Sequence, residues 1–411
     1  MRSDTRLRNT TIVVLAASVQ QIPLILRLQS MGARVVTIDN RPDNPGHRLA
    51  AATHDIDLRD IDRVLAAVRQ EGAHGIIAAA SDVAVETAAH VGHALGLSAP
   101  SPSAVAALLS KAAFRAFQHS AGLPAPQWAL KDDEPPVGPW IVKPVLGSGS
   151  RGVRLIDDAA LLPDALANAA AASLDGRAIV EQAISGSQHT AEGWMQAGRV
   201  AAGLVTDRLT ADAPLVATLG HRTPGSLSAA QEAEVLAAVE RVFQLLGYAD
   251  GPFDADIVVN DQGPFVIEAS TRAGGNGLMQ LVKASTGVDT MELIALHAVG
   301  LLPQLSAWRA MPAGVQILAS PLGGTLDYDP HAVERLRNEQ WVEDLTLDEA
   351  PGASVQPFTD GRCRFGQVVI SCRDGASVAN RLAEVFNRLD LQVMRKRCRG
   401  GTFAARGDGR G

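Results

Sequence analysis

The segment VKPVLGSGSRGVRLI, residues 142–156, places Gly147, Gly149 and Gly152 in a G-x-G-x-x-G pattern. This spacing is typical of a dinucleotide-binding turn, which requires a strand before the glycines and a helix that begins on them. Apolar residues precede the glycines, but the alternating residues GVRLI follow them. The pattern therefore predicts strand, glycine loop and strand, a hairpin whose backbone N–H groups can lie over phosphates, with Lys143 on the incoming strand. A plain flexible hairpin is the alternative that the glycines alone leave open.

The composition excludes several classes of protein. The chain has 411 residues, of which 46% are hydrophobic and 20% charged, so we expect a globular protein of about two to four packed units. A net charge of −7 and an aromatic content of 4% argue against a nucleic-acid surface. The cysteines Cys363, Cys372 and Cys398 are widely spaced, which argues against structural zinc and favours a reducing compartment. The apolar run at residues 11–18 is too short to span a membrane, so we expect a cytoplasmic protein.

The first hundred residues alternate between strand and helix patterns. Buried strands are expected at residues 11–18, 33–39 and 75–81, and helices are expected between and after them. Consecutive strands that are separated by helices need crossover connections, so this part is predicted to be a doubly wound parallel sheet. Its first turn, AASVQQ, contains no glycine, which gives little support to dinucleotide binding there.

The later segments mix strands and helices. One helix is expected from Ser103 to about Ala121, and residues 177–184 and 189–205 are expected to form a pair of strands. Further elements are predicted as a helix at about 228–247, the strands FDADIVVN and PFVIEAS around the turn DQG, helices near 276–285 and 289–299, and a helix near 376–389.

Two carboxylates stand out in the segment FDADIVVNDQGPFVIEASTR. Asp256 and Glu268 lie at comparable depth on the two strands of the predicted hairpin, so both could face one cation. Acids within apolar strands are costly unless they are paired or bind a metal, and magnesium accepts one or two carboxylates together with nucleotide phosphates. Arg272, four residues later, suits a carboxylate or phosphoryl group beside that metal. An ordinary cross-strand ion pair is the alternative interpretation.

Five segments in order resemble the ATP-grasp superfamily, over about residues 11–300. They are SKAAFRAFQHSAGLPAP, VKPVLGSGSRGV, AIVEQAISGSQHTAEGW, FDADIVVN and VIEASTRAGGNG. The resemblance implies an α/β and α+β fold in which a doubly wound pre-ATP-grasp sheet is followed by two lobes that clamp ATP and by a small C-terminal domain. The expected parts are a pre-ATP-grasp domain at 1–101, a lobe with the lysines and the glycine loop at 102–205, a lobe with the metal-binding acids at 206–311, an α+β domain at 312–394 and a disordered tail rich in Arg and Gly at 395–411.

The resemblance also implies roles for single residues. Lys111 and Lys143 would contact the ATP phosphates, together with the loop residues Gly147, Ser148, Gly149, Ser150 and Gly152. Glu181, Ala183 and Ile184 would form the linker that reads adenine, with backbone hydrogen bonds from 183–184, and Glu192 would lie near the ribose or the metal. Asp256 and Glu268 would bind magnesium, with two ions expected, and Arg272 would hold the acyl phosphate. His221, Gly274 and Gly275 are candidate substrate contacts. Many members of the superfamily carry Asn where this chain has Ser270, and since a hydroxyl is a weaker ligand, the second metal would be held differently or partly through water.

The implied reaction needs no nucleophilic side chain. A substrate carboxylate would attack the γ-phosphate of ATP, and an amine would then displace phosphate from the acyl phosphate. The leading hypothesis is an ADP-forming carboxylate–amine ligase that acts on small molecules such as amino acids. The segments SPLGGTL and RFGQVVISCRDGASVANRLAEVFNRL look like the small domain of amino-acid and dipeptide ligases. A carboxylase that forms carboxyphosphate, similar to biotin carboxylase, and a nucleotide sensor without turnover are the alternatives. Relatives are commonly homodimers, although no surface stripe indicates one here.

Overall fold

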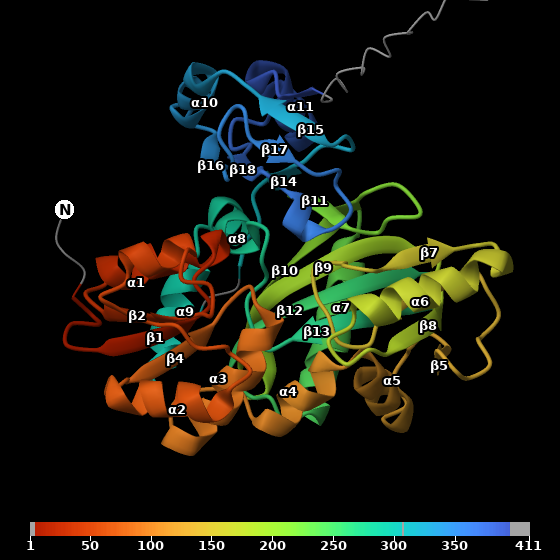
Figure 1. Ribbon diagram of the computed structural model, residues 1–411, viewed down its shortest axis with the longest axis horizontal. Coiled ribbons are helices and arrows are strands. Elements are labelled where there is room, and N and C mark those ends of the chain that lie inside the picture. The colour runs from red at the N-terminus through yellow and green to blue at the C-terminus, as the bar shows by residue number, and fades with distance from the viewer. Residues whose placement is uncertain (1–4, 306–307, 395–411) are drawn as a thin grey trace, which may run out of the picture.

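The first layer is a parallel sheet, as the sequence predicts. A computed structural model describes residues 5–305 and 308–394. The strands are β1 (Thr11–Leu15), β2 (Arg34–Ile38), β3 (Ala52–His54) and β4 (Gly75–Ala78). They lie in the order β3-β2-β1-β4, and every neighbouring pair is parallel (Figure 1). Strand β3 was not predicted because three residues, ATH, give no readable alternation.

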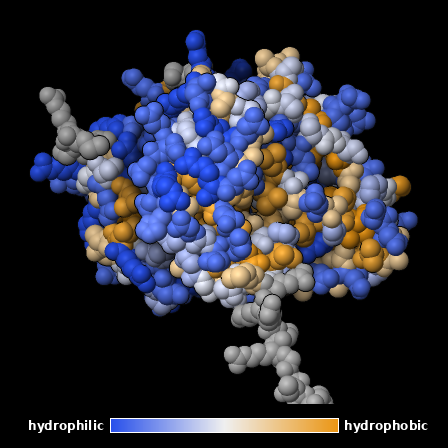
Figure 2. Space-filling view, turned by 90° about the horizontal axis from the view of Figure 1, so that it is seen from above, coloured by the Kyte–Doolittle hydropathy of each residue, from blue (hydrophilic) through white to orange (hydrophobic). Residues whose placement is uncertain are grey.

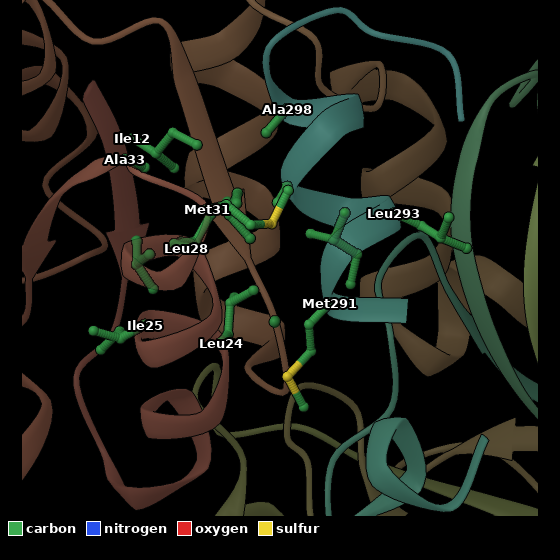
Figure 3. Packing of buried hydrophobic residues seen from close by; sticks show 14 of the residues in the cluster. Ile12, Leu24, Ile25, Leu28, Met31, Ala33, Met291, Leu293 and Ala298 are labelled. Atoms are coloured by element: carbon green, nitrogen blue, oxygen red, sulfur yellow. The ribbon is translucent and has the colours of Figure 1, made fainter. Parts of the chain in front are cut away.

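Helices from distant parts of the chain cover this sheet. Helices α2 (Ile61–Gln70) and α3 (Asp82–Leu95) contribute to one cluster with β1 and β2, and α1 (Ile22–Ser30) and α9 (Thr290–Ala298) contribute to another. Figure 3 shows side chains of α1 and α9 directed toward each other, among them Leu24, Leu28 and Met291. One side of the first sheet is therefore covered with the help of α9, which follows the predicted strands of Asp256 and Glu268 in the sequence. This packing brings residues near 272 beside the first layer.

The predicted helix from Ser103 to Ala121 is wrong, because the structure has two helices there. They are α4 (Pro102–Leu109) and α5 (Lys111–Ser120). Ser110 between them is extended, with φ −91° and ψ 120°, and its side chain accepts a hydrogen bond from the backbone N–H of Ala113. A serine in this position caps a new helix. The helical spacing of apolar residues therefore continues through Ser110, although one helix ends before it and another begins after it.

A four-stranded sheet carries the glycine loop. Its order is β5-β8-β6-β7, from β5 (Trp128–Leu130), β8 (Ala178–Gln182), β6 (Trp140–Pro144) and β7 (Arg154–Ile156), and α6 (Leu162–Ala172) packs against it. Strands β6 and β7 are antiparallel neighbours. The predicted arrangement of strand, glycine loop and strand is therefore confirmed.

The largest sheet has eight strands in the order β13-β12-β9-β10-β11-β14-β18-β16. Their bounds are β9 (Ser187–Gln196), β10 (Arg199–Thr210), β11 (Thr218–Thr223), β12 (Gly251–Asn260), β13 (Gly263–Ser270), β14 (Ala313–Leu318), β16 (Val342–Leu347) and β18 (Gly366–Ser371). The predicted pairing of 177–184 with 189–205 is wrong. Strand β8 lies in the smaller sheet, and the second segment is divided between β9 and β10. The turn between these two is Ala197-Gly198, with positive φ at both residues, and Ala gives no turn signal in the sequence.

Helix α7 (Ala229–Leu245) fixes which face of this sheet is open. Alternate residues of β12, Phe253, Ala255, Ile257 and Val259, are buried in one cluster with apolar side chains of α7. Because side chains alternate along a strand, the residues between them point to the opposite face. Asp254 and Asp256 belong to that face, so packing against α7 directs the candidate metal acids away from the apolar core.

The C-terminal region extends the large sheet and adds a small sheet of its own. Strands β14, β16 and β18 continue it, and β15 (Gly324–Asp327), β17 (Ser354–Val355) and β19 (Gln392–Met394) form a small sheet. The helices here are α10 (Pro330–Arg337) and α11 (Val378–Leu389), and α8 (Leu278–Thr286) packs beside β14 and β18. The predicted tail at 395–411 lies outside the described residues.

The surface is mixed in character. Figure 2 shows hydrophilic residues over much of the face seen from above, with separate hydrophobic patches between them. Within the described part of the chain, no helix is long and apolar enough to cross a membrane. The expected homodimer stays a prediction.

The packing of α7 yields a test of the fold. Phe243 is fully buried, with its ring centroid 5.6 Å from that of Phe253 and 5.3 Å from that of Tyr248. We expect Phe243→Ala to lower the free energy of unfolding by about 3–5 kcal/mol, because it removes buried apolar contacts and leaves a cavity. Urea denaturation measures this loss. Leu245→Ala is the control on the same helix, since Leu245 is 38% exposed, and an equal loss in both variants would contradict the assigned packing.

Candidate active site

Asp256 and Glu268 lie directly opposite each other on β12 and β13, as the sequence predicts. Their side chains are 28% and 45% exposed. Asp256 accepts a hydrogen bond from Thr190 Oγ1 at 2.8 Å and lies 3.2 Å from Arg208 Nη1. Glu268 lies 3.5 Å from Lys111 Nζ. Each acid is therefore accessible and already has a cation beside it, and Arg208 is a site residue that sequence reasoning missed.

A bulge beside Glu268 is held by helix α5. Asp256 pairs with Glu268, but the next pair joins Ile257 to Val266, which leaves Ile267 as the extra residue. Arg115 Nη2 donates to the carbonyl oxygen of Ile267 at 2.8 Å, and Gln118 Nε2 donates to that of Val266 at 2.8 Å. The same helix thus satisfies two carbonyls next to a candidate metal ligand.

Lys143, Glu181 and Arg115 form a buried ionic cluster. Lys143 Nζ donates to Glu181 Oε2 at 2.8 Å, and Arg115 Nε lies 3.0 Å from Glu181 Oε1. Burial raises the pKa of Glu181, but Arg115 and Lys143 outweigh this effect and bring the pKa down to about 2. Burial lowers the pKa of Lys143, and the attraction of Glu181 offsets only part of that shift. Glu181 thus serves as the partner of two cations.

Sequence reasoning missed Arg115 and Gln118. A signal for both was nevertheless present, because Lys111, Arg115 and Gln118 follow the spacing of one helix face. All three are buried in the structure. Polar side chains on the buried face of an amphipathic helix need partners, and such a run can mark a site.

The glycine loop reaches two other parts of the fold. Lys111 Nζ donates to the carbonyl oxygen of Gly147 at 2.9 Å. The backbone N–H of Gly361, in the C-terminal region, donates to the carbonyl oxygen of Gly149 at 3.1 Å. Ser148 and Gly149 are exposed at the loop tip, and Gly149, Ser150 and Gly152 have positive φ. The loop is therefore an exposed tip with left-handed backbone, anchored at two carbonyls.

The predicted adenine linker follows β8. Ala183 and Ile184 come directly after the strand and are partly buried. The backbone N–H of Ala183 already donates to the carbonyl oxygen of Pro139 at 2.8 Å. The expected hydrogen bonds from the backbone at 183–184 stay a prediction, in which Ala183 would contribute its carbonyl oxygen because its N–H is engaged.

Glu192 lies beneath the glycine segment that follows Arg272. The backbone N–H of Gly274 donates to both carboxylate oxygens of Glu192, at 2.9 and 3.1 Å, and only 1% of the residue is exposed. Asp254, which the sequence analysis missed, lies opposite Glu192 in the sheet. Burial raises the pKa of both carboxyls, and the Asp254 carboxylate raises the pKa of Glu192 further. Arg272 lowers both pKa values but does not cancel the rise. The predicted contact of Glu192 with the ribose or metal stays a prediction, and its closest polar partner is protein backbone.

Arg272 is held by the first layer. Its Nε donates to Asp82 Oδ1 at 2.8 Å, and its Nη1 donates to Asp254 Oδ2 at 3.3 Å. Asp82 is the first residue of α3 and lies 190 positions before Arg272 in the sequence. The next residues face the same layer, because Gln20 Oε1 accepts from the backbone N–H of Asn276 at 3.1 Å and lies 3.5 Å from where a Cβ on Gly275 would be. Asp82 and Gln20 are partners that sequence spacing could not reveal.

His221 lies on β11 opposite Arg208, close to the acid pair. Its Nδ1 is 3.2 Å from Thr206 Oγ1, and 4% of the residue is exposed. Burial lowers the pKa of His221 to about 4, so the ring is neutral at pH 7. Ser270 lies opposite Asp254 and two residues after Glu268 on the same strand. Both residues line the same face as the acid pair, and their contacts with substrate and metal stay predictions.

The residues fit a magnesium ion that is shared with phosphates. In residues 5–305 and 308–394, no group of three or more His, Cys, Asp or Glu side chains could hold a metal ion. Magnesium commonly takes one or two carboxylates and completes its shell with phosphate oxygens and water. Asp256 and Glu268 supply two carboxylates on one open face. An arriving ion would compete with Arg208 and Lys111, which contact these acids.

Known proteins share the sequence patterns and the fold. The pattern of the ATP-grasp domain matches residues 137–280, and that of the L-amino acid ligase C-terminal domain 2 matches residues 317–394. An uncharacterized protein of Sinorhizobium fredii is 26% identical over 353 residues, covering 82% of this chain and 73% of that protein. A formate-dependent phosphoribosylglycinamide formyltransferase of Burkholderia pseudomallei is 28% identical over 368 residues, covering 85% and 86%.

The structural likeness is equally extensive. The crystal structure of an L-amino acid ligase from Bacillus licheniformis superposes with a TM-score of 0.80 at 21% identity, covering 95% of this chain and 99% of that one. At this level of identity the superposition establishes the fold. The predicted resemblance is confirmed at the level of domains: the chain contains an ATP-grasp domain, and an L-amino acid ligase C-terminal domain follows it.

Proposed function

We propose that this chain is an ADP-forming carboxylate–amine ligase that activates a small carboxylate, such as an amino acid, and joins it to an amine. One observation carries the proposal. The ammonium of Lys111 lies 2.9 Å from the Gly147 carbonyl oxygen and 3.5 Å from Glu268 Oε1. The glycine loop and a metal acid are thus within reach of one side chain, as a site that holds a triphosphate requires.

The proposed chemistry asks the protein for positioning and charge neutralisation. A carboxylate oxygen of the substrate attacks the γ-phosphorus, and the bond to the β–γ bridging oxygen breaks, which releases ADP and leaves an acyl phosphate. The amine nitrogen then attacks the acyl carbon, phosphate leaves with its bonding electrons, and the nitrogen gives a proton to water. Lys111 and Lys143 would balance the charge of the phosphates, and Arg272 would bind the acyl phosphate. Magnesium on Asp256 and Glu268, with two ions expected, would supply further neutralisation.

The names of similar proteins support this class of reaction. One relative is named for the formate-dependent formylation of phosphoribosylglycinamide, and the superposed structure is that of an L-amino acid ligase. The C-terminal match is to an L-amino acid ligase domain. The formyltransferase name favours an organic carboxylate over bicarbonate, and the two ligase descriptions favour an amino-acid-like one. We further propose that the protein acts in the cytoplasm on small molecules.

A substrate screen tests the proposal. Phosphate release from ATP would be measured with amino acids, hydroxy acids and amines, singly and in pairs, and the products would be identified by mass spectrometry. We expect ADP formation that requires both an organic carboxylate and an amine, with an amide as product. Release of ADP with bicarbonate alone would favour a carboxylase instead. ATP binding without turnover under every combination would favour a nucleotide sensor.

The metal assignment predicts the effect of a neutral substitution. Glu268→Gln removes a carboxylate from the acid pair, so kcat/KM should fall by at least about a hundredfold while the fold is retained. Steady-state kinetics and circular dichroism measure the two properties. Asp261→Asn is the matched control, because Asp261 is exposed at the turn of the same hairpin. Full activity of Glu268→Gln would remove Glu268 from the site.

The role of Arg272 predicts a different kinetic pattern. Arg272→Met should lower kcat by about 10²–10³-fold, because a preorganised cation beside the developing charge is lost. The dissociation constant for ADP should stay within about threefold, since the proposed contact is with the acyl phosphate and not with the nucleotide. Calorimetric titration with ADP supplies this control. A large loss of ADP affinity with unchanged kcat would place Arg272 in nucleotide binding instead.

A further inference from the structure

Arg115 is the least exposed member of the ionic cluster around Glu181. It is 0% exposed, whereas Glu181 is 2% and Lys143 is 7% exposed. Its guanidinium addresses both carboxylate oxygens, with Nε 3.0 Å from Oε1 and Nη2 donating to Oε2 at 3.2 Å. Lys143 contacts Oε2 alone. Arg115 therefore contacts both oxygens of Glu181, whereas Lys143 contacts one of them and is the more easily released cation.

The charges of this cluster do not cancel. Two cations and one anion leave a single positive charge, and a buried pair of opposite charges is strongly held because little water screens it. If Arg115 were absent, Lys143 and Glu181 would form a closed neutral pair. With Arg115 present, Glu181 is already balanced, so Lys143 can turn toward another anion without leaving an unpaired carboxylate behind.

We propose that Arg115 is a positioning residue that neutralises Glu181 and so keeps the charge of Lys143 available for the phosphates of ATP. The inference rests on the proposed function for the role of Lys143. Arg115 does not touch the nucleotide in this account and acts through Glu181. Other contacts keep it in place, since Nη1 donates to Gln118 Oε1 at 2.7 Å and Nη2 donates to the Ile267 carbonyl oxygen at 2.8 Å.

The position of Lys111 adds to this argument. Lys111 and Arg115 lie four residues apart on α5, and Lys111 contacts the glycine loop and Glu268. A repelling charge from Lys111 and Arg115 lowers the pKa of Lys143, after the larger effect of burial. Three cations thus converge near one buried carboxylate, an arrangement that favours the arrival of a polyanion.

A double substitution tests the charge balance. Arg115→Met should raise the dissociation constant for ATP at least about tenfold, because Lys143 is then captured by Glu181. Adding Glu181→Gln to that variant restores the single positive charge, so the double variant should bind ATP at least about threefold more tightly than Arg115→Met does. Isothermal titration with ATP in magnesium buffer measures each constant. Arg199→Met is the control for the same change in net charge, since the Arg199 side chain is 77% exposed, and it should bind ATP as the wild type does.

A merely structural role predicts another result. In that case the double variant would bind ATP as weakly as Arg115→Met or more weakly, and this outcome would overturn the inference. If Arg115→Met fails to fold, Arg115→Lys decides the question, because it keeps the charge but loses the forked contact with Glu181 and Ile267. ATP affinity within about threefold of the wild type supports the charge role, and a loss of about tenfold or more contradicts it.

Binding and turnover separate this inference from the proposed function. A wild-type protein that shows the predicted pattern of ATP affinities but makes no amide would retain the role of Arg115 and refute the ligase. A wild-type protein that makes an amide but shows no recovery in the double variant would retain the ligase and refute the role of Arg115.

Discussion

Repulsion among carboxylates on the open face of the eight-stranded sheet is the constraint on which the site depends. Glu192, Asp254, Asp256 and Glu268 lie on neighbouring strands in mutual register, so their side chains share one face. Such a group is stable only if cations or shared protons balance it. Arg208 contacts Asp256, Lys111 contacts Glu268, and Arg272 contacts Asp254. Burial raises the pKa of Glu192 and Asp254. The excess of negative charge that the protein must balance also makes this face suitable for a divalent cation with phosphates.

The groups that position or balance the charges of this site come from several parts of the fold. Asp82 in the first layer orients Arg272, and helix α5 supplies Lys111 and Arg115. The C-terminal region reaches the glycine loop through the hydrogen bond from Gly361 to Gly149. Gly361 lies shortly before β18, a strand of the large sheet, so this contact links the glycine loop to the region that extends that sheet. The site is therefore assembled from segments that are far apart in the sequence.

The sequence predicted the features that local patterns encode. The glycine hairpin could be recognised because alternation resumes at Gly152, and the short turn placed Asp256 and Glu268 at comparable depth. The turn alone would pair Asp256 with Ile267, and the bulge there brings Glu268 opposite Asp256. The break at Ser110 was missed because the apolar helical period runs through it. The bulge at Ile267 and the partners Arg208, Asp82 and Asp254 depend on which strands and helices become neighbours. Pairing across 190 residues has no local signal, so those contacts required the structure.

In the site that we propose, a triphosphate binds between the cations Lys111 and Lys143 and the acid pair Asp256 and Glu268. A crystal structure with magnesium and a non-hydrolysable ATP analogue tests it most directly. We expect magnesium on Asp256 and Glu268, and phosphate oxygens in contact with the ammonium groups of Lys111 and Lys143. A nucleotide bound elsewhere, or phosphates that contact neither the acid pair through magnesium nor Lys143, would contradict it.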